Sequence, residues 1–103
     1  MNINGVNISG GSSGTIRMVN TSPVTLTASE YYIYVNMTTP CVINLLNTSL
    51  ANSNGYNIKN IGESTVRIVP SSPNLIDEQT EINIKNAYTS LNLVVATNNW
   101  YVI

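Results

Sequence analysis

Charged side chains are scarce in this 103-residue chain: four Lys or Arg and five Asp or Glu residues make up 9% of it, with a formal net charge of -1. An ordinary globular domain has about 25% charged residues. Without a basic surface, neither nucleic acid nor an anionic membrane is an expected partner. No segment approaches the roughly 20 apolar residues that span a bilayer, so we expect no membrane insertion.

Histidine is absent and Cys41 is the only cysteine. The absence of histidine excludes histidine-based triads and removes the commonest metal ligand. A single cysteine excludes a disulfide within the chain, so packing alone must hold the fold. With no neighbour to activate its thiol, Cys41 is interpreted as a small buried hydrophobic residue. We therefore expect a protein that is not an enzyme and that uses no cofactor or metal.

Short, β-branched, alternating apolar runs fill most of the chain, separated mainly by Asn, Ser and Thr. Alternation with period two predicts strands that bury one face, and no segment has helical spacing. The expected fold is all-β: a small antiparallel β-sandwich or a prism-like domain. The runs cover residues 24–27, 31–35, 41–45, 56–58, 65–69, 81–84, 91–95 and 100–103.

The sequence predicts a single domain over residues 15–103, preceded by a flexible arm, residues 1–14, that can serve as a docking segment. Three successive strand pairs are predicted as hairpins: residues 31–36 with 41–46, 56–61 with 65–70, and 91–97 with 100–103. In the last pair, Asn98 and Asn99 are the expected turn residues, because Asn tolerates the left-handed conformation.

Period two also assigns the faces of these strands. Tyr32 and Tyr34 then lie on the outer face, where an apolar ring needs a ligand, another strand or another subunit to cover it. The residues expected to point inward are Ile33, Val35, Ile43, Leu45, Ile58, Val66, Ile68, Ile82, Ile84, Leu91, Leu93 and Val95.

Several short motifs occur in a fixed order over residues 24–103: Asn57-Ile-Lys-Asn60, Val66-Arg-Ile-Val-Pro70, Leu75-Ile-Asp77 and Asn99-Trp-Tyr-Val-Ile103. This ordered set resembles a module of bacteriophage and other viral fibre proteins. The resemblance implies a small all-β domain, commonly a homotrimer, on a tail fibre, head fibre or capsid spike.

From this resemblance we expect a non-enzymatic virion structural protein: a fibre or capsid decoration domain, made in the host cytoplasm and exposed on the particle. Its expected partners are other copies of itself, capsid or tail components and, at a receptor-binding tip, a glycan of the host surface. The low charge agrees with this expectation, because a symmetric assembly can bury neutral faces around its axis.

Aromatic residues are the candidate contact residues, because sugar rings stack on aromatic faces and Asn, Ser and Thr bind hydroxyl groups. An alternative hypothesis is therefore a monomeric carbohydrate-binding module that uses Tyr32 and Tyr34. For Trp100 we favour burial in the core or in a subunit contact. The candidates for a glycan or subunit contact are Tyr32, Tyr34, Tyr56, Tyr88, Trp100 and Tyr101.

The acidic cluster of Asp77, Glu78 and Glu81 is the only group of side chains that suggests catalysis or metal binding. Two carboxylates can act as acid and base on a glycosidic bond, which leaves a polysaccharide-degrading enzyme as a third hypothesis. A calcium site is a further alternative, although the spacing lacks the usual alternating ligand loop. We favour the interpretation that these residues solvate a turn.

Overall fold

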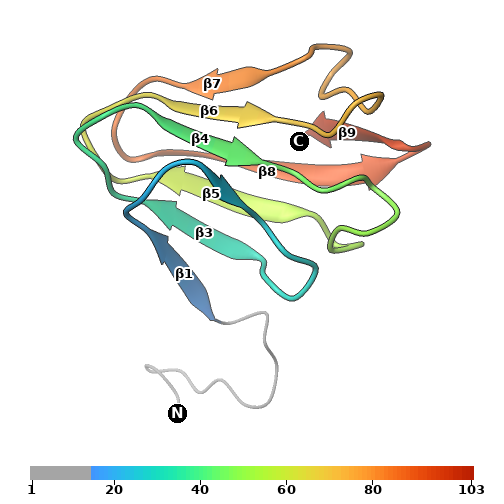
Figure 1. Cartoon of the computed structure of the whole chain (residues 1–103), viewed down its shortest axis with the longest axis horizontal. Coiled ribbons are helices and arrows are strands. Elements are labelled where there is room, and N and C mark those ends of the chain that lie inside the picture. The colour runs from blue at the N-terminus through green and yellow to red at the C-terminus, as the bar shows by residue number, and fades with distance from the viewer. Residues whose placement is uncertain (1–14) are drawn as a thin grey trace.

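The computed structural model describes residues 15–103, which form nine strands in two sheets (Figure 1). The all-β prediction is confirmed. The predicted arm, residues 1–14, lies outside the described residues. Within residues 15–103, no helix has the length and apolar character needed to cross a membrane. The strands are β1 (Ile16–Val19), β2 (Val24–Thr25), β3 (Tyr32–Val35), β4 (Cys41–Asn44), β5 (Tyr56–Asn60), β6 (Val66–Val69), β7 (Ile82–Ile84), β8 (Thr89–Ala96) and β9 (Asn99–Val102).

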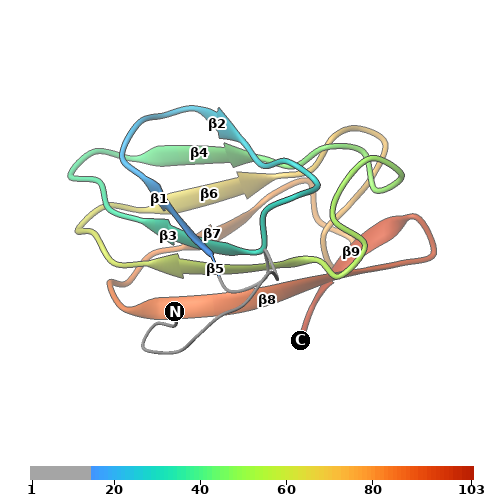
Figure 2. The ribbon, with the colours of Figure 1, turned by 90° about the horizontal axis from the view of Figure 1, so that it is seen from below.

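The first six strands alternate between the two sheets. One sheet has the order β1-β3-β5-β8-β9, and the other has the order β2-β4-β6-β7. Strands β1, β3 and β5 are parallel neighbours, and so are β2, β4 and β6. The chain therefore winds as a two-sided solenoid of three coils, with its turns at the two ends of the strands (Figures 1 and 2).

The direction of the chain reverses after the third coil. Strand β7 pairs antiparallel with β6, β8 pairs antiparallel with β5, and β9 pairs antiparallel with β8. Figure 2 shows β8 running along one side of the molecule before it turns into β9. These three strands close the C-terminal end of the solenoid, as terminal repeats do in other repeat proteins.

The prediction of an antiparallel sandwich is therefore wrong for two of its three hairpins. Strands β3 and β4 lie in different sheets, as do β5 and β6. The reason for the error is that alternation usually indicates antiparallel strands with one wet face, whereas parallel strands are usually covered on both faces. Here the parallel strands also bury only one face. The third hairpin, β8 with β9, is confirmed, but its turn residues are Thr97 and Asn98, both with positive φ, and not the predicted Asn98 and Asn99, because Asn99 pairs with Ala96 as the first residue of β9.

The predicted inward face is confirmed throughout both sheets. Ile82, Leu91 and Val95 are partly buried against the core, and the other residues predicted to point inward are buried. The parallel register aligns apolar residues across the four-stranded sheet, where Val24, Ile43 and Ile68 follow one another. These inward side chains therefore lie next to one another in successive coils.

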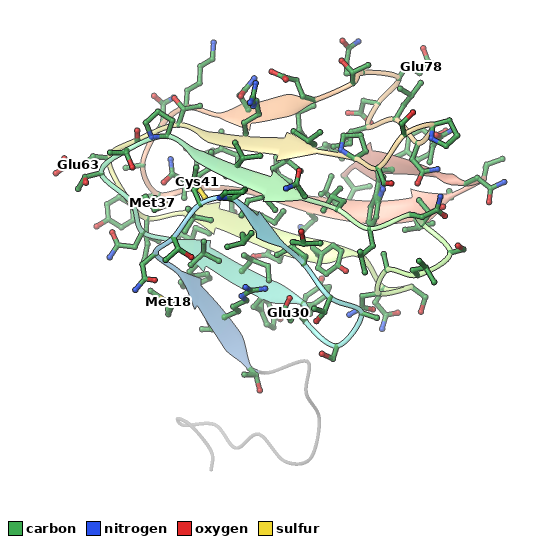
Figure 3. All side chains as sticks on the ribbon, viewed as in Figure 1. Met18, Glu30, Met37, Cys41, Glu63 and Glu78 are labelled. Carbon is green, nitrogen blue, oxygen red and sulfur yellow. The ribbon has the colours of Figure 1, made fainter. Side chains whose placement is uncertain are left out.

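Close backbone contacts stack the turns that join the coils. Gly62 has no room for a side chain, because a Cβ there would lie 2.4 Å from the backbone nitrogen of Met37. The Glu63 amide donates to the Met37 carbonyl at 3.1 Å. Figure 3 places Met37 and Glu63 at the same end of the molecule. The second and third coils are thus joined through their turns as well as through their strands.

The buried side chain of Asn60 connects the turns at this same end of the molecule. It is 1% exposed, and its Oδ1 accepts a hydrogen bond from the Gly62 amide at 3.0 Å. Its Nδ2 donates to the carbonyls of Ser64 at 2.9 Å and Asn86 at 3.5 Å. One buried amide therefore satisfies backbone groups from two turns.

We predict that Asn60→Ala lowers the free energy of unfolding by about 3 kcal/mol, because it leaves buried backbone groups without partners. Urea unfolding followed by circular dichroism measures this change. The exposed Asn36→Ala variant is the matched control and should change stability by less than about 0.5 kcal/mol. Equal stability of the two variants would contradict the role given to Asn60.

Candidate functional site

The acidic residues lie in and around a turn. Asp77 and Glu78 have φ values of 48° and 66°, and they are the central residues of a tight turn closed by hydrogen bonds between Ile76 and Gln79. Asp77 Oδ1 accepts a bond from the Val102 amide at 3.1 Å. Within residues 15–103, no three His, Cys, Asp or Glu side chains gather closely enough to hold a metal ion. This arrangement fits the interpretation of Asp77 and Glu78 as turn residues.

Cys41 lies in the core, where it is 1% exposed. Burial raises the pKa of its thiol above the ordinary value, and a hydrogen bond from Ser22 partly opposes this effect. A raised pKa reduces the thiolate fraction at neutral pH, and the thiolate is the nucleophilic form. Cys41 therefore has the environment of a structural residue.

Two of the predicted contact residues, Tyr56 and Trp100, are core residues. Both side chains are 0% exposed, and their ring centroids lie 5.7 Å apart. The Tyr56 hydroxyl donates to the Thr27 carbonyl at 2.8 Å and accepts from the Asn52 amide at 3.2 Å. As a correction to the sequence analysis, neither residue can contact a glycan or another subunit. For Trp100, burial in the core agrees with one of the two favoured interpretations.

The other predicted tyrosines lie at the surface, in two places. Tyr88 is 74% exposed in the turn between β7 and β8, with a φ of 60°. Tyr32, Tyr34 and Tyr101 are partly exposed on the outer face of the five-stranded sheet. We call this outer surface the tyrosine face. It includes Ile16 and Met18 of β1, Tyr32 and Tyr34 of β3, Asn57 and Lys59 of β5, Ser90, Asn92 and Val94 of β8, and Tyr101 of β9.

Contacts between neighbouring strands order the tyrosine face. The Lys59 ammonium lies 5.8 Å from the centre of the Tyr34 ring, within the range of a cation–π contact. Asn57 Nδ2 donates to Asn92 Oδ1. Tyr32 packs edge-on against Tyr31, with ring centroids 4.7 Å apart. The face therefore presents ordered rings and amides, which suit stacking and hydrogen bonding rather than acid–base chemistry.

At its β1 side, the tyrosine face becomes apolar and more exposed. Ile16 is 45% exposed and Met18 is 53% exposed. Figure 3 shows Met18 on β1, far from Glu78 at the C-terminal side of the molecule. The sequence analysis did not predict β1, although Ile16-Arg-Met-Val19 alternates. Its pattern is obscured because the inward residue Arg17 is charged.

Arg17 points to the inside of the solenoid at the N-terminal end of residues 15–103. It lies in register with Ile33 of β3, which is in the core. Its Nη1 donates to both Glu30 carboxylate oxygens at 2.9 Å and to the Thr25 carbonyl at 3.3 Å. Thr15, Arg17, Ser29 and Glu30 line a depression of about 270 Å³. The N-terminal end of the interior is therefore polar, in contrast to the apolar core behind it.

Comparisons with known proteins add no further assignment. No family model, curated protein or solved structure matches this chain. The tyrosine face, the β1 end of the described solenoid and the ordered motifs of the sequence are therefore the features that bear on function.

We predict that stability decreases above about pH 8.5. Burial raises the pKa values of both Cys41 and Tyr56. The folded state then holds these protons at pH values where the unfolded chain releases them, so the free energy of unfolding falls as pH rises. Urea unfolding at several values between about pH 7 and pH 9.5 measures the slope.

Cys41→Ala should flatten this slope even if it lowers the stability at pH 7, because it removes the contribution of the thiol and leaves only that of Tyr56. Leu50→Ala, at an exposed position, should keep the wild-type slope. An equally steep fall in Cys41→Ala would contradict the prediction.

Proposed function

We propose that this chain is a non-enzymatic virion structural protein, a fibre or capsid decoration domain that assembles as a homotrimer. The observation that carries the proposal is a structural difference between the two ends of the solenoid. Antiparallel strands close the C-terminal end, whereas β1 at the other end exposes the apolar residues Ile16 and Met18. A protein that is closed at one end and exposes apolar side chains at the other suits a module mounted on a larger particle.

The tyrosine face supplies the surface for self-association in this proposal. Its rings, amides and aliphatic side chains resemble the composition of protein interfaces, which are rich in Tyr and Met and poor in acidic residues. Lys59 is the only ionised group among its members, and it already lies over the Tyr34 ring. Neutral faces can pack around a symmetry axis without desolvating many charges.

We predict that the full chain forms a trimer at micromolar concentration, with a mass three times the 11.2 kDa of one chain. Size-exclusion chromatography with light scattering measures this mass. Met18→Lys should weaken association at least tenfold, because it places a charge in an apolar contact. Leu50→Lys is the matched control, since Leu50 is 63% exposed outside the tyrosine face. A wild-type monomer at micromolar concentration would overturn the trimer.

A second candidate function is a carbohydrate-binding module. The observation that favours it is that Tyr32 and Tyr34 lie two residues apart on one face of β3, a spacing of about 7 Å. Asn57 lies beside Tyr32 on the next strand, with its amide directed to Asn92. Rings at this spacing, next to amides, can stack on a sugar and bind its hydroxyl groups.

For this candidate, Tyr34→Ala should abolish binding on a glycan array while the light-scattering mass stays unchanged. Tyr88→Ala is the control, because Tyr88 is exposed in a turn and should leave binding at wild-type strength. Loss of the oligomer in Tyr34→Ala, with no glycan bound by the wild type, would favour the structural role instead.

A further inference from the structure

The outer edges of the two sheets are protected unequally. At the edge of β9, the Trp100 amide donates to the Leu75 carbonyl at 2.8 Å, and the Trp100 carbonyl accepts from the Asp77 amide at 3.0 Å. The Val102 amide is bound by the Asp77 side chain. Residues 75–77 therefore already bind the peptide groups of Trp100 and the amide of Val102, which leaves little of this edge for another strand.

The two edges of the four-stranded sheet are blunted by their length and flanks. Strand β2 has two residues and follows Pro23, and the Thr25 carbonyl already accepts from Arg17. Strand β7 has three residues between the charged residues Glu81 and Lys85. Short strands, proline and charge are the usual devices that keep an edge from pairing.

Strand β1 carries the remaining edge, and within residues 15–103 no strand covers it. The Val19 carbonyl accepts from the Asn36 amide at 2.9 Å, so Val19 directs its peptide groups toward β3. Peptide groups alternate in direction along a strand. Those of Ile16 and Met18 therefore point away from the sheet, and these are the residues whose apolar side chains are exposed.

The side chains beside β1 on the inner face of the sheet restrict the sequence of a strand that can pair with this edge. A strand added beside β1 would direct one side chain into the depression lined by Thr15, Arg17, Ser29 and Glu30. Glu30 and Thr25 engage Nη1 of Arg17, and Nη2 and Nε are the remaining donors of its guanidinium group. An acidic or amide side chain beside Arg17 completes that group, and apolar side chains suit the outer positions beside Ile16 and Met18.

We propose that the edge of β1 is a strand-addition site for an extended segment of the virion protein that carries this domain. The segment has an acidic or amide residue between two apolar residues. Its backbone pairs with the peptide groups of Ile16 and Met18, as in other cases of strand addition. This inference rests on the proposed function, because it identifies the partner on which the domain is mounted.

The test uses the full chain labelled with ¹⁵N and the capped peptide acetyl-Thr-Ile-Glu-Val-Thr-amide as the probe. Without the peptide, the Met18 amide should exchange with solvent at least tenfold faster than the Val19 amide. Titration should shift the resonances of residues 16–20 and slow the exchange of Met18. A peptide with Lys in place of Glu should bind at least tenfold more weakly, because Lys has no acceptor for Nη2 and Nε of Arg17.

Two changes test whether the backbone makes the contact. Met18→Pro removes an N–H that β3 does not use, and edge strands tolerate proline at such positions; it should weaken binding at least tenfold. If Met18→Pro does not fold, the wild-type protein with a peptide N-methylated at Ile, Glu, Val and the second Thr gives the same test, because these changes remove the backbone donors for either strand direction. Undiminished binding of the N-methylated peptide would overturn the proposal.

Two other results would also overturn it. One is a Met18 amide that is as protected as that of Val19 before peptide is added, because residues 1–14 or a second copy would then already occupy the edge. The other is the absence of binding at millimolar peptide. In either case a trimer mass by light scattering would leave the proposed structural function standing, so the two proposals fail separately.

Discussion

The in-register stacking of one coil on the next is the constraint on which the rest of this structure depends. Parallel ladders fix each inward residue directly beside its counterpart, as with Ile43 and Ile68. Because both sheets contribute to one core, a turn that displaced the chain along the solenoid axis would misalign the strands that follow it. The turns must therefore stack as closely as the strands, which explains why Gly62 lies against the Met37 backbone.

This constraint also gives the abundance of asparagine a physical reason. Buried Asn60 and Asn74 bind backbone groups of neighbouring turns. Asn47 binds the Ser49 amide of its own turn, and Asn52 binds both the nearby Asn54 amide and the Glu30 carbonyl of an earlier turn. A neutral amide can donate and accept in a confined space without the desolvation penalty of a charge. The low charge of the chain is thus partly a property of its turns. The case for self-association depends instead on the exposed apolar side chains of β1.

Sequence reasoning predicts the faces of the strands well and their neighbours poorly. Burial enforces period two, so residues such as Ile33, Ile68 and Leu93 could be assigned to the core. Pairing has no such local signal, because a turn of a few residues can lead back into one sheet or across to the other. The β8–β9 hairpin was predictable since two residues leave the chain no other route. Period two also separates Tyr56, which shares a face with inward Ile58, from Tyr32, which lies opposite inward Ile33, so the burial of Tyr56 could have been predicted.

Each end of a solenoid presents two problems to a folded chain. An interior left open exposes apolar core, and an edge left unpaired invites another strand. This chain solves both problems at β9, where backbone and Asp77 cover the edge and Trp100 fills the interior. At β1 the Arg17–Glu30 ion pair solves only the first problem by making this end of the interior polar, and no strand within residues 15–103 covers the edge. The peptide groups of Ile16 and Met18 stay directed outward beside exposed apolar side chains, and a strand that pairs there would extend the same stacking that holds the three coils together.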